Sequence, residues 1–196
     1  MTNEKPLYSS SDAIAPAASS SDGLIAFRRV VKGFNEVWIL PPFGDGAPFR
    51  FLQTGNFTRA MVQVSPDGKW AAYYSTETGQ PEVYVQSFPK PAAHQQLSID
   101  GGTQPRWSRD RPELYDVGLD GRMMGVAVRS DAAGIRPGAR TALFPTPQVA
   151  GSRTILRVRQ QYDVAPDGRS LINVPVAEGA SAPMTLLQNW AGGLRK

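Results

Sequence analysis

The stretch Val64-Ser65-Pro66-Asp67-Gly68-Lys69-Trp70 returns later in the chain as Val164-Ala165-Pro166-Asp167-Gly168-Arg169-Ser170. Such a motif makes a tight turn, because Pro presets φ, Asp bonds back to the backbone and Gly adopts the left-handed conformation. Weaker relatives are Ser20-Ser21-Asp22-Gly23-Leu24-Ile25 and Trp107-Ser108-Arg109-Asp110-Arg111-Pro112-Glu113-Leu114. Their aspartates, Asp22, Asp67, Asp110 and Asp167, follow at steps of 45, 43 and 57 residues. The chain therefore contains four copies of one unit.

The segments between these turns have the composition of strands. Short runs rich in β-branched and aromatic residues are Leu24–Arg29, Glu36–Leu40, Lys69–Ser75, Glu82–Phe88, Met123–Arg129, Arg169–Val176 and Met184–Trp190, with a further strand around His94–Ile99. The longest stretch without Gly or Pro, Ser152–Ala165, also alternates with a period of two. We expect almost no helix.

Four strands in about 45 residues are typical of a propeller blade. The sequence predicts an all-β protein, a β-propeller of about four blades, as one domain over residues 1–196 with repeats near 23–66, 67–109, 110–166 and 167–196. Both faces of the strand after the Asp67 turn are apolar, as in a blade packed between neighbours. A two-sheet β-sandwich is the alternative architecture.

Composition excludes several kinds of site. The 196 residues carry a net charge of +4, no cysteine and one histidine, His94, so disulfides, thiolate metal centres and histidine cages are excluded. We predict no metal and no cofactor: the aspartates of the turns lack the alternating oxygen ligands of a calcium loop. The arginine cluster from Arg136 to Arg159 contains a single aromatic residue, Phe144, which disfavours nucleic-acid binding.

The N-terminus has no apolar signal region, and no stretch of about 18 apolar residues occurs. We expect no membrane partner and a cytoplasmic location.

Three stretches of the sequence resemble the TolB-type, WD-like β-propeller repeat. They are VSPDGKWAAYYSTETGQPEVYVQSF from Val64 to Phe88, Gly101-Gly102-Thr103-Gln104-Pro105-Arg106-Trp107-Ser108, and the stretch from Tyr162 to Arg169. The likeness covers residues 48–196 and is closest to propellers at the C-terminal end of large bacterial proteins, often behind a serine/threonine kinase domain. It implies a docking surface, a ligand site or a gate to a hydrolase domain. Propellers of this family usually have six or more blades, so about four indicate a short or partial propeller.

Two departures from the repeat are visible. The third turn, Arg109-Asp110-Arg111-Pro112, lacks the glycine and must have another shape, whereas the following Leu119-Asp120-Gly121-Arg122 turn is intact. The fourth repeat arrives late, and the extra length between Pro145 and Arg159 predicts an exposed or channel-rim loop.

Closure of the ring has two solutions. The N-terminal segment 1–22 contains Lys5–Ser9, which could add the missing strand to the last blade and close a four-bladed ring. Otherwise the open blade edges pair with a second copy, giving a homodimer with eight blades.

The motifs of serine hydrolases and of protein kinases are absent from the sequence. It has no Gly-x-Ser-x-Gly elbow and no kinase motif, and His94, the single base for a serine nucleophile, falls in a predicted exposed connection between strands. The glutamates Glu36, Glu77, Glu82, Glu113 and Glu178 fall outside the expected innermost strands. We therefore predict a non-catalytic protein- or ligand-binding module. The alternatives are a hydrolase or lyase with its site in the channel, and an accessory propeller that is a fragment of a larger fusion protein.

Candidate ligand-binding residues lie just upstream of the turns, on strands that would line the channel: Arg59, Gln63, Gln104, Arg106, Arg157 and Arg159. Guanidinium groups there would bind a small anion or the carboxylates of a protein partner. The alternative is that they bond neighbouring backbone and acidic residues such as Asp110 and Asp163. A purely structural, turn-forming role is predicted for Asp67, Gly68, Asp120, Gly121, Asp167 and Gly168.

Overall fold

The computed structural model describes residues 6–32, 34–42, 46–52, 55, 57–92, 94–131, 134–146 and 160–173. Fourteen strands are found in this part of the chain, and no α-helix. No helix in these ranges is long and apolar enough to cross a membrane.

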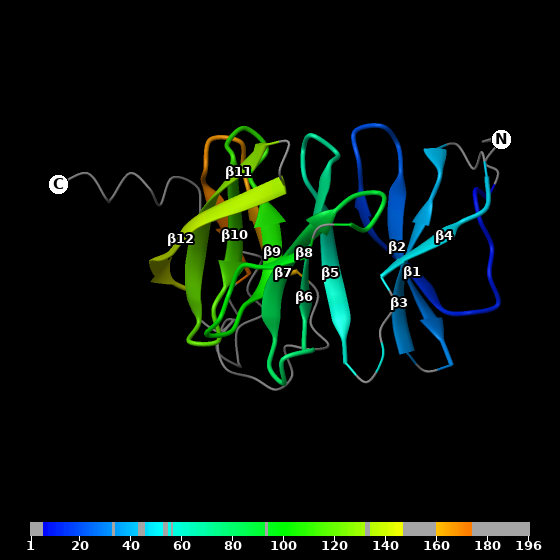
Figure 1. Cartoon of the computed structure of the whole chain (residues 1–196), viewed down its shortest axis with the longest axis horizontal. Coiled ribbons are helices and arrows are strands. Elements are labelled where there is room, and N and C mark those ends of the chain that lie inside the picture. Colours follow the sequence, from blue (N-terminus) through cyan, green and yellow to red (C-terminus); the bar gives the residue numbers. More distant parts are fainter. Residues whose placement is uncertain are drawn as a thin grey trace, which may run out of the picture.

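The strands form four antiparallel sheets, which we number as blades along the chain (Figure 1). The first blade consists of β1 (Ile14–Ser19), β2 (Ile25–Val31), β3 (Phe34–Leu40) and β4 (Phe49–Leu52). The second blade consists of β5 (Arg59–Val64), β6 (Trp70–Ser75), β7 (Glu82–Ser87) and β8 (His94–Gln96). The third blade consists of β9 (Thr103–Trp107), β10 (Glu113–Val117), β11 (Arg122–Asp131) and β12 (Gly134–Pro145). In the fourth blade, β13 (Tyr162–Val164) pairs with β14 (Ser170–Ile172).

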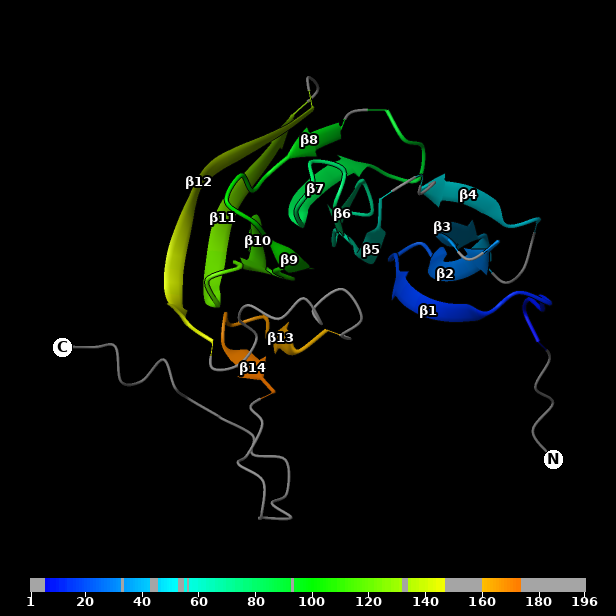
Figure 2. The ribbon, with the colours of Figure 1, turned by 90° about the horizontal axis from the view of Figure 1, so that it is seen from below.

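The blades follow one another around an arc, with β1, β5, β9 and β13 on its inner side (Figure 2). This arrangement confirms the prediction of a nearly all-β, partial propeller. Each sheet begins one strand upstream of the predicted repeat boundary, because the Asp-Gly turn joins the first two strands of a blade rather than two blades.

Apolar side chains fill the space between successive blades. Ile39 and Phe51 of the first blade pack with Tyr73 and Tyr84 of the second, and Trp70 and Val85 on the opposite face of the second blade pack with Leu114 of the third. The strand β6 is buried along its whole length, because neighbouring sheets cover both of its faces.

Residues 6–9 do not join the described part of the last blade. Lys5 lies outside the described residues, residues 6–9 form no strand, and the ring of Tyr8 lies 5.4 Å from that of Phe27 in the first blade. The predicted closing strand is therefore not found where residues 6–9 are described, and the sheets leave an open arc.

Part of the extra length before the fourth repeat lies in a long hairpin. β11 and β12 have 10 and 12 residues, against 6 and 3 in β7 and β8. The predicted loop between Pro145 and Arg159 lies mostly outside the described residues. The predicted strand Ser152–Ala165 is described only from residue 160 onward, and the predicted strand Met184–Trp190 is not described.

Candidate functional site

The inner strands carry four of the predicted ligand-binding residues. Arg59 and Gln63 belong to β5, and Gln104 and Arg106 belong to β9. Arg157 and Arg159 lie outside the described residues. Glu36, Glu77, Glu82 and Glu113 lie off the inner strands, and Glu178 is not described.

Arg106 stands at the centre of a polar row across three blades. Its Nη1 donates a hydrogen bond of 3.0 Å to Oε1 of Gln63, and its Nε lies 3.3 Å from Oδ1 of Asp163 on β13. The three residues hold the same place in their repeats, two positions before Ser65, Ser108 and Ala165. Equivalent positions in successive blades thus supply an amide, a guanidinium and a carboxylate that contact one another, which we call the inner row.

The inner row is partly open to solvent. The side chain of Arg106 is 26% exposed and that of Asp163 57% exposed. Within the described ranges, Nη2 of Arg106 has no hydrogen-bond partner. A guanidinium donates up to five hydrogen bonds, so Arg106 keeps donors for a ligand while two neighbours fix its orientation.

Gln104 joins the third and fourth blades. Gln104 is 1% exposed. Its backbone carbonyl oxygen accepts hydrogen bonds from the Tyr162 hydroxyl at 2.7 Å and from Gln160 Nε2 at 3.0 Å. Its side-chain Oε1 accepts a hydrogen bond from the Gln161 backbone N–H at 2.6 Å. The carboxamide is thus engaged with the neighbouring blade and not presented to a ligand.

A bulge shared by the inner strands explains this geometry. Gln104 has a φ of +56° and Met61 a φ of +55°, and both precede the serine of their turn by four residues. The strand pairing shifts at both places, between Ala60 and Gln63 and opposite Tyr115 to Val117. A β-bulge redirects the side chains that follow it, and in both strands the next residues include the member of the inner row.

Arg59 belongs to a second, separate cluster. Its Nη2 lies 2.7 Å from Oε2 of Glu77, and its guanidinium lies over the rings of Phe57 and Tyr73, 4.9 and 5.8 Å from their centroids. Burial raises the pKa of Glu77, but the hydrogen bond and charge of Arg59, with a smaller contribution from His94, outweigh it and leave that pKa below its ordinary value. Arg59 is held by Glu77, which agrees with the alternative that an acidic neighbour engages it.

His94 lies on the edge strand β8 and not in a connection between strands. Its ring stacks on Tyr84 at 5.0 Å, Tyr84 stacks on Tyr73 at 5.9 Å, and His94 Nε2 lies 3.4 Å from Oε1 of Glu77. No serine hydroxyl contacts the imidazole among the described residues. The His94 side chain is 41% exposed, and its ring forms the outer end of this aromatic stack.

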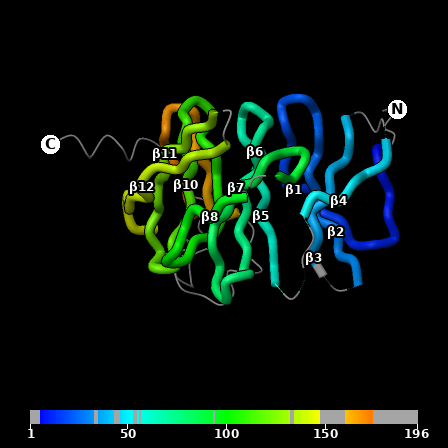
Figure 3. The backbone as a smooth tube through the Cα atoms, viewed as in Figure 1, coloured from blue at the N-terminus to red at the C-terminus, as the bar shows by residue number. Residues whose placement is uncertain are grey.

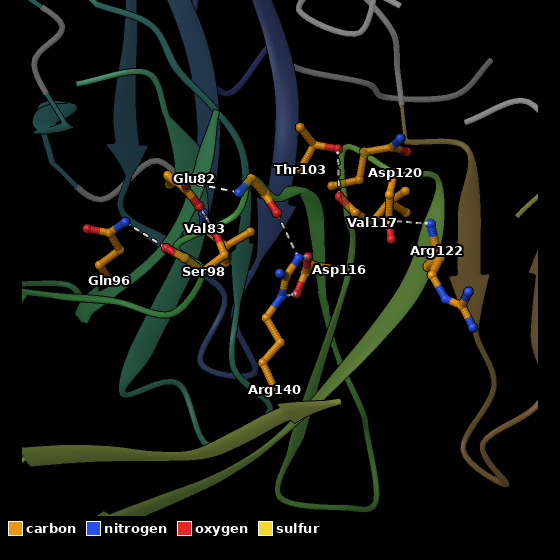
Figure 4. A network of polar contacts seen from close by, with 12 residues as sticks. Glu82, Val83, Gln96, Ser98, Thr103, Asp116, Val117, Asp120, Arg122 and Arg140 are labelled. Carbon is orange, nitrogen blue, oxygen red and sulfur yellow. Dashed lines mark hydrogen bonds and ion pairs between the residues drawn. The ribbon is translucent and has the colours of Figure 1, made fainter. Parts of the chain in front are cut away.

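A buried ionic network between the second and third blades was not anticipated (Figure 4). Asp116 on β10 is fully buried and accepts hydrogen bonds from Nη2 and Nε of Arg140 at 2.5 and 3.1 Å. Nearby, Glu82 on β7 is 1% exposed and accepts hydrogen bonds from the Ser98 hydroxyl and from the Gly101 N–H, while Arg140 donates to the Gly101 carbonyl at 2.9 Å.

Burial raises the pKa of Asp116, and the charge of Glu82 raises it further, while Arg140 opposes both. A buried carboxylate with such a pKa shift, close to a second buried carboxylate, is typical of acid–base sites. Here the two carboxylates lie between blades and away from the inner strands, and Arg140 binds Asp116 with two nitrogens. The contacts of Asp116, Arg140, Glu82 and Gly101 connect the second and third blades, and we call this group the clasp. A charged residue in the otherwise apolar run Leu114-Tyr115-Asp116-Val117 is the sequence signal that marks it.

The turns have the geometry that left-handed glycines provide. Gly68, Gly121 and Gly168 have φ values of +69°, +78° and +87°, and Asp67, Asp120 and Asp167 each accept a hydrogen bond from the backbone N–H two residues later. The third repeat differs: no left-handed residue occurs at Arg109–Pro112, and the Glu113 N–H bonds to the Arg111 carbonyl.

Comparison with known proteins bears on the fold. No protein-family model matches the chain, and no curated protein sequence matches it. A solved structure of a protein assigned as TolB from Agrobacterium tumefaciens is similar with a TM-score of 0.53 and 17% identity, over 68% of this chain and 50% of that one. TolB from Acinetobacter baumannii is similar with a TM-score of 0.58 and 16% identity, over 83% of this chain and 38% of that one.

The chain spans half or less of the length of these two structures. At this level of identity the likeness concerns the fold, and the four sheets are blades of a TolB-like β-propeller.

Proposed function

We propose that the chain is a non-catalytic binding module of the TolB-like repeat family, and that Arg106 anchors a carboxylate of its ligand. The observation that carries this proposal is the inner row, in which Gln63 and Asp163 orient a partly exposed guanidinium that keeps unused donors. Arginine suits this role, because its planar fork matches a carboxylate with two parallel hydrogen bonds.

Asp163 modulates the site in this proposal. Its carboxylate lies beside Nε of Arg106 and partly neutralises the guanidinium, so an incoming carboxylate competes with it. Because the pair is partly exposed, the competition involves a modest free energy. Among the described residues, the two most deeply buried carboxylates, Glu82 and Asp116, are engaged by hydrogen bonds of the clasp, which favours binding over a channel-sited hydrolase or lyase.

Titration followed by NMR tests the proposal with two probes, citrate and a short peptide rich in Asp and Glu, with the Asn and Gln version of the peptide as its control. We expect the Arg106 resonances to shift with one acidic probe, and Arg106→Gln to weaken that binding about tenfold or more, the usual effect of losing a charge-assisted hydrogen bond. Binding of citrate alone indicates a small anion, and binding of the peptide alone indicates a protein partner.

Two variants sharpen the measurement. Asp163→Asn removes the competing charge and should tighten binding. Arg136→Gln changes a guanidinium that is 68% exposed and lies on β12, away from the inner row, so it should leave binding as in the wild type. Equal weakening by Arg106→Gln and Arg136→Gln would show that overall charge, and not the inner row, attracts the probe.

A further inference from the structure

The first blade has one face that none of the other described sheets covers. Its face toward the second blade carries Ala26, Val37 and Ile39. Because side chains alternate along a strand, Phe27 and its cross-strand partner Trp38 lie on the opposite face. The first blade lies at one end of the molecule, beside the second blade (Figures 1 and 3). In the described chain, residues 6–12 form no strand, and two of them, Tyr8 and Asp12, contact this outward face.

Two contacts hold this segment, which we call the N-terminal strap. The Tyr8 ring lies 5.4 Å from that of Phe27, and Oδ2 of Asp12 lies 2.7 Å from Nη2 of Arg29. Phe27 is 5% exposed. The strap therefore contacts the apolar Phe27 and neutralises the charge of Arg29. In each of the other blades, the corresponding face packs against the preceding sheet.

The outward face resembles a surface between blades in its composition. The Arg29 guanidinium lies 4.7 Å from the centroid of the Trp38 ring, Trp38 Nε1 donates a hydrogen bond of 2.8 Å to Glu36, and Arg50 Nη1 lies 3.4 Å from Glu36. Such a sheet face, with an aromatic centre and paired charges, suits a specific partner more than free solvent.

The other end of the arc offers a complementary face. On the fourth blade, Tyr162, Val164 and Ile172 pack toward the third blade. Asp163 and Leu171 are partners across the strand pair and lie on the other side, 57% and 39% exposed. In the described part of the chain, the arc thus has an acidic and apolar face at the fourth blade and a basic and aromatic face at the first.

The inner row gives the direction of packing. Gln63 of the second blade contacts Arg106 of the third, and Arg106 contacts Asp163 of the fourth. Gln63 and Arg106 each contact the blade that follows, so the surface that continues this order after the fourth blade is the outward face of a first blade. No extensive contact joins the two ends within the described part of one chain.

We propose that the outward face of the first blade docks on the fourth blade of a second copy, head to tail, and that the N-terminal strap covers it in the isolated chain. Docking displaces Tyr8 and Asp12, places Phe27 and Trp38 against Leu171, and brings Arg29 to Asp163. Two unlike surfaces meet, so the assembly closes as a ring or grows by further copies. This differs from pairing through blade edges, since no strand is added to a sheet.

Sedimentation equilibrium of the full chain tests the proposal. The wild type should have the mass of one chain, 21.2 kDa, and the double variant Tyr8→Ala/Asp12→Ala should at least double its average mass at the same concentration. Adding Leu171→Glu should return the mass to that of one chain. The matched control is Leu143→Glu, which changes a leucine of similar exposure, 44%, on β12, and should leave the association intact.

Folding is checked by circular dichroism, and Asp12→Asn alone provides a milder variant that keeps the Tyr8 contact and should associate more weakly than the double variant. A folded double variant that remains at the mass of one chain overturns the proposal. Association that Leu171→Glu and Leu143→Glu weaken equally, or that neither weakens, shows a surface other than the fourth blade and overturns it as well.

Discussion

Ser65 and Ser108 occupy the same place in two repeats but have different surroundings. The Ser65 hydroxyl donates to Oδ1 of Asp67 at 2.5 Å and accepts a hydrogen bond from the Trp70 N–H at 3.0 Å. The Ser108 hydroxyl is fully buried, and among the described residues it has no hydrogen-bond partner, because Arg109–Pro112 replaces the Asp-Gly turn. The same side chain is thus satisfied in one turn and orphaned in another.

This difference predicts opposite outcomes for one substitution. Ser65→Ala leaves the buried Trp70 N–H without an acceptor and should lower the free energy of unfolding by about 1–3 kcal/mol. Ser108→Ala removes a hydroxyl without a partner and should change it by less than about 0.5 kcal/mol. Urea unfolding of both variants is the measurement, and equal losses would contradict the assigned hydrogen bonds.

Residue types at the turns were predictable from sequence because their reasons are local. Pro, Asp and Gly act through φ and through a hydrogen bond two residues away. The partners of Arg106 were less predictable, because Gln63 and Asp163 are distant in sequence and meet through blade packing. Arg106 with Asp163 does match the expected alternative of an acidic neighbour. Gln104 had no local signal for its left-handed φ or its burial.

At the scale of the strands, apolar runs such as Lys69–Ser75 predicted β6 well. β1 was missed, because Ile14-Ala15-Pro16-Ala17-Ala18-Ser19 consists mostly of small residues and contains a proline. β12 was missed because Pro137 and Gly138 interrupt it. Both are edge strands of their sheets, where one backbone side needs no partner strand and proline is tolerated.

The clasp between blades predicts a pH dependence at this scale. Arg140→Met leaves Asp116 buried without its cation and should cost about 3–5 kcal/mol of unfolding free energy at pH 7. Removing Arg140 takes away the group that lowers the pKa of Asp116, so that pKa rises further above its unfolded value. The folded variant then binds a proton more readily than the unfolded chain, and its stability falls as pH rises through this window.

Urea unfolding at pH 4 and at pH 7 gives the free energy of unfolding of each variant. The loss of unfolding free energy in Arg140→Met, relative to the wild type, should be smaller at pH 4. Arg136→Met is the matched control on the same strand. Arg136 is 68% exposed and pairs with Asp131 at 3.2 Å, so its loss should cost less than about 1 kcal/mol at both pH values. A deficit for Arg140→Met that does not depend on pH would argue against a charged Asp116 in the clasp.

At the scale of the whole molecule, an open arc makes its blades unequal. The second and third blades have neighbours on both faces, whereas the first has the strap on one face and the fourth packs in the described part through one face (Figure 2). Local opening requires the least free energy where the fewest apolar contacts are lost.

Hydrogen exchange should therefore vary along the arc. We expect the slowest backbone amides in β6, β7 and β10, and exchange at least tenfold faster in β13 and β14. Exchange followed by mass spectrometry of peptides resolves the blades. Equal protection in all four would indicate that they open as one closed ring, contrary to the open arc.

The inner row has a consequence for how such propellers diversify. Each blade contributes one side chain at the position two residues before its turn, which holds Ala18, Gln63, Arg106 and Asp163 in the four repeats. The strand pairing beside it is made by backbone groups and shifts at the bulge, so it does not require one particular side chain, and in the first blade Ala18 packs against the apolar cluster. Duplication of blades followed by single substitutions at this position can therefore change the charge and hydrogen-bonding groups of the inner row while every sheet keeps its strand register.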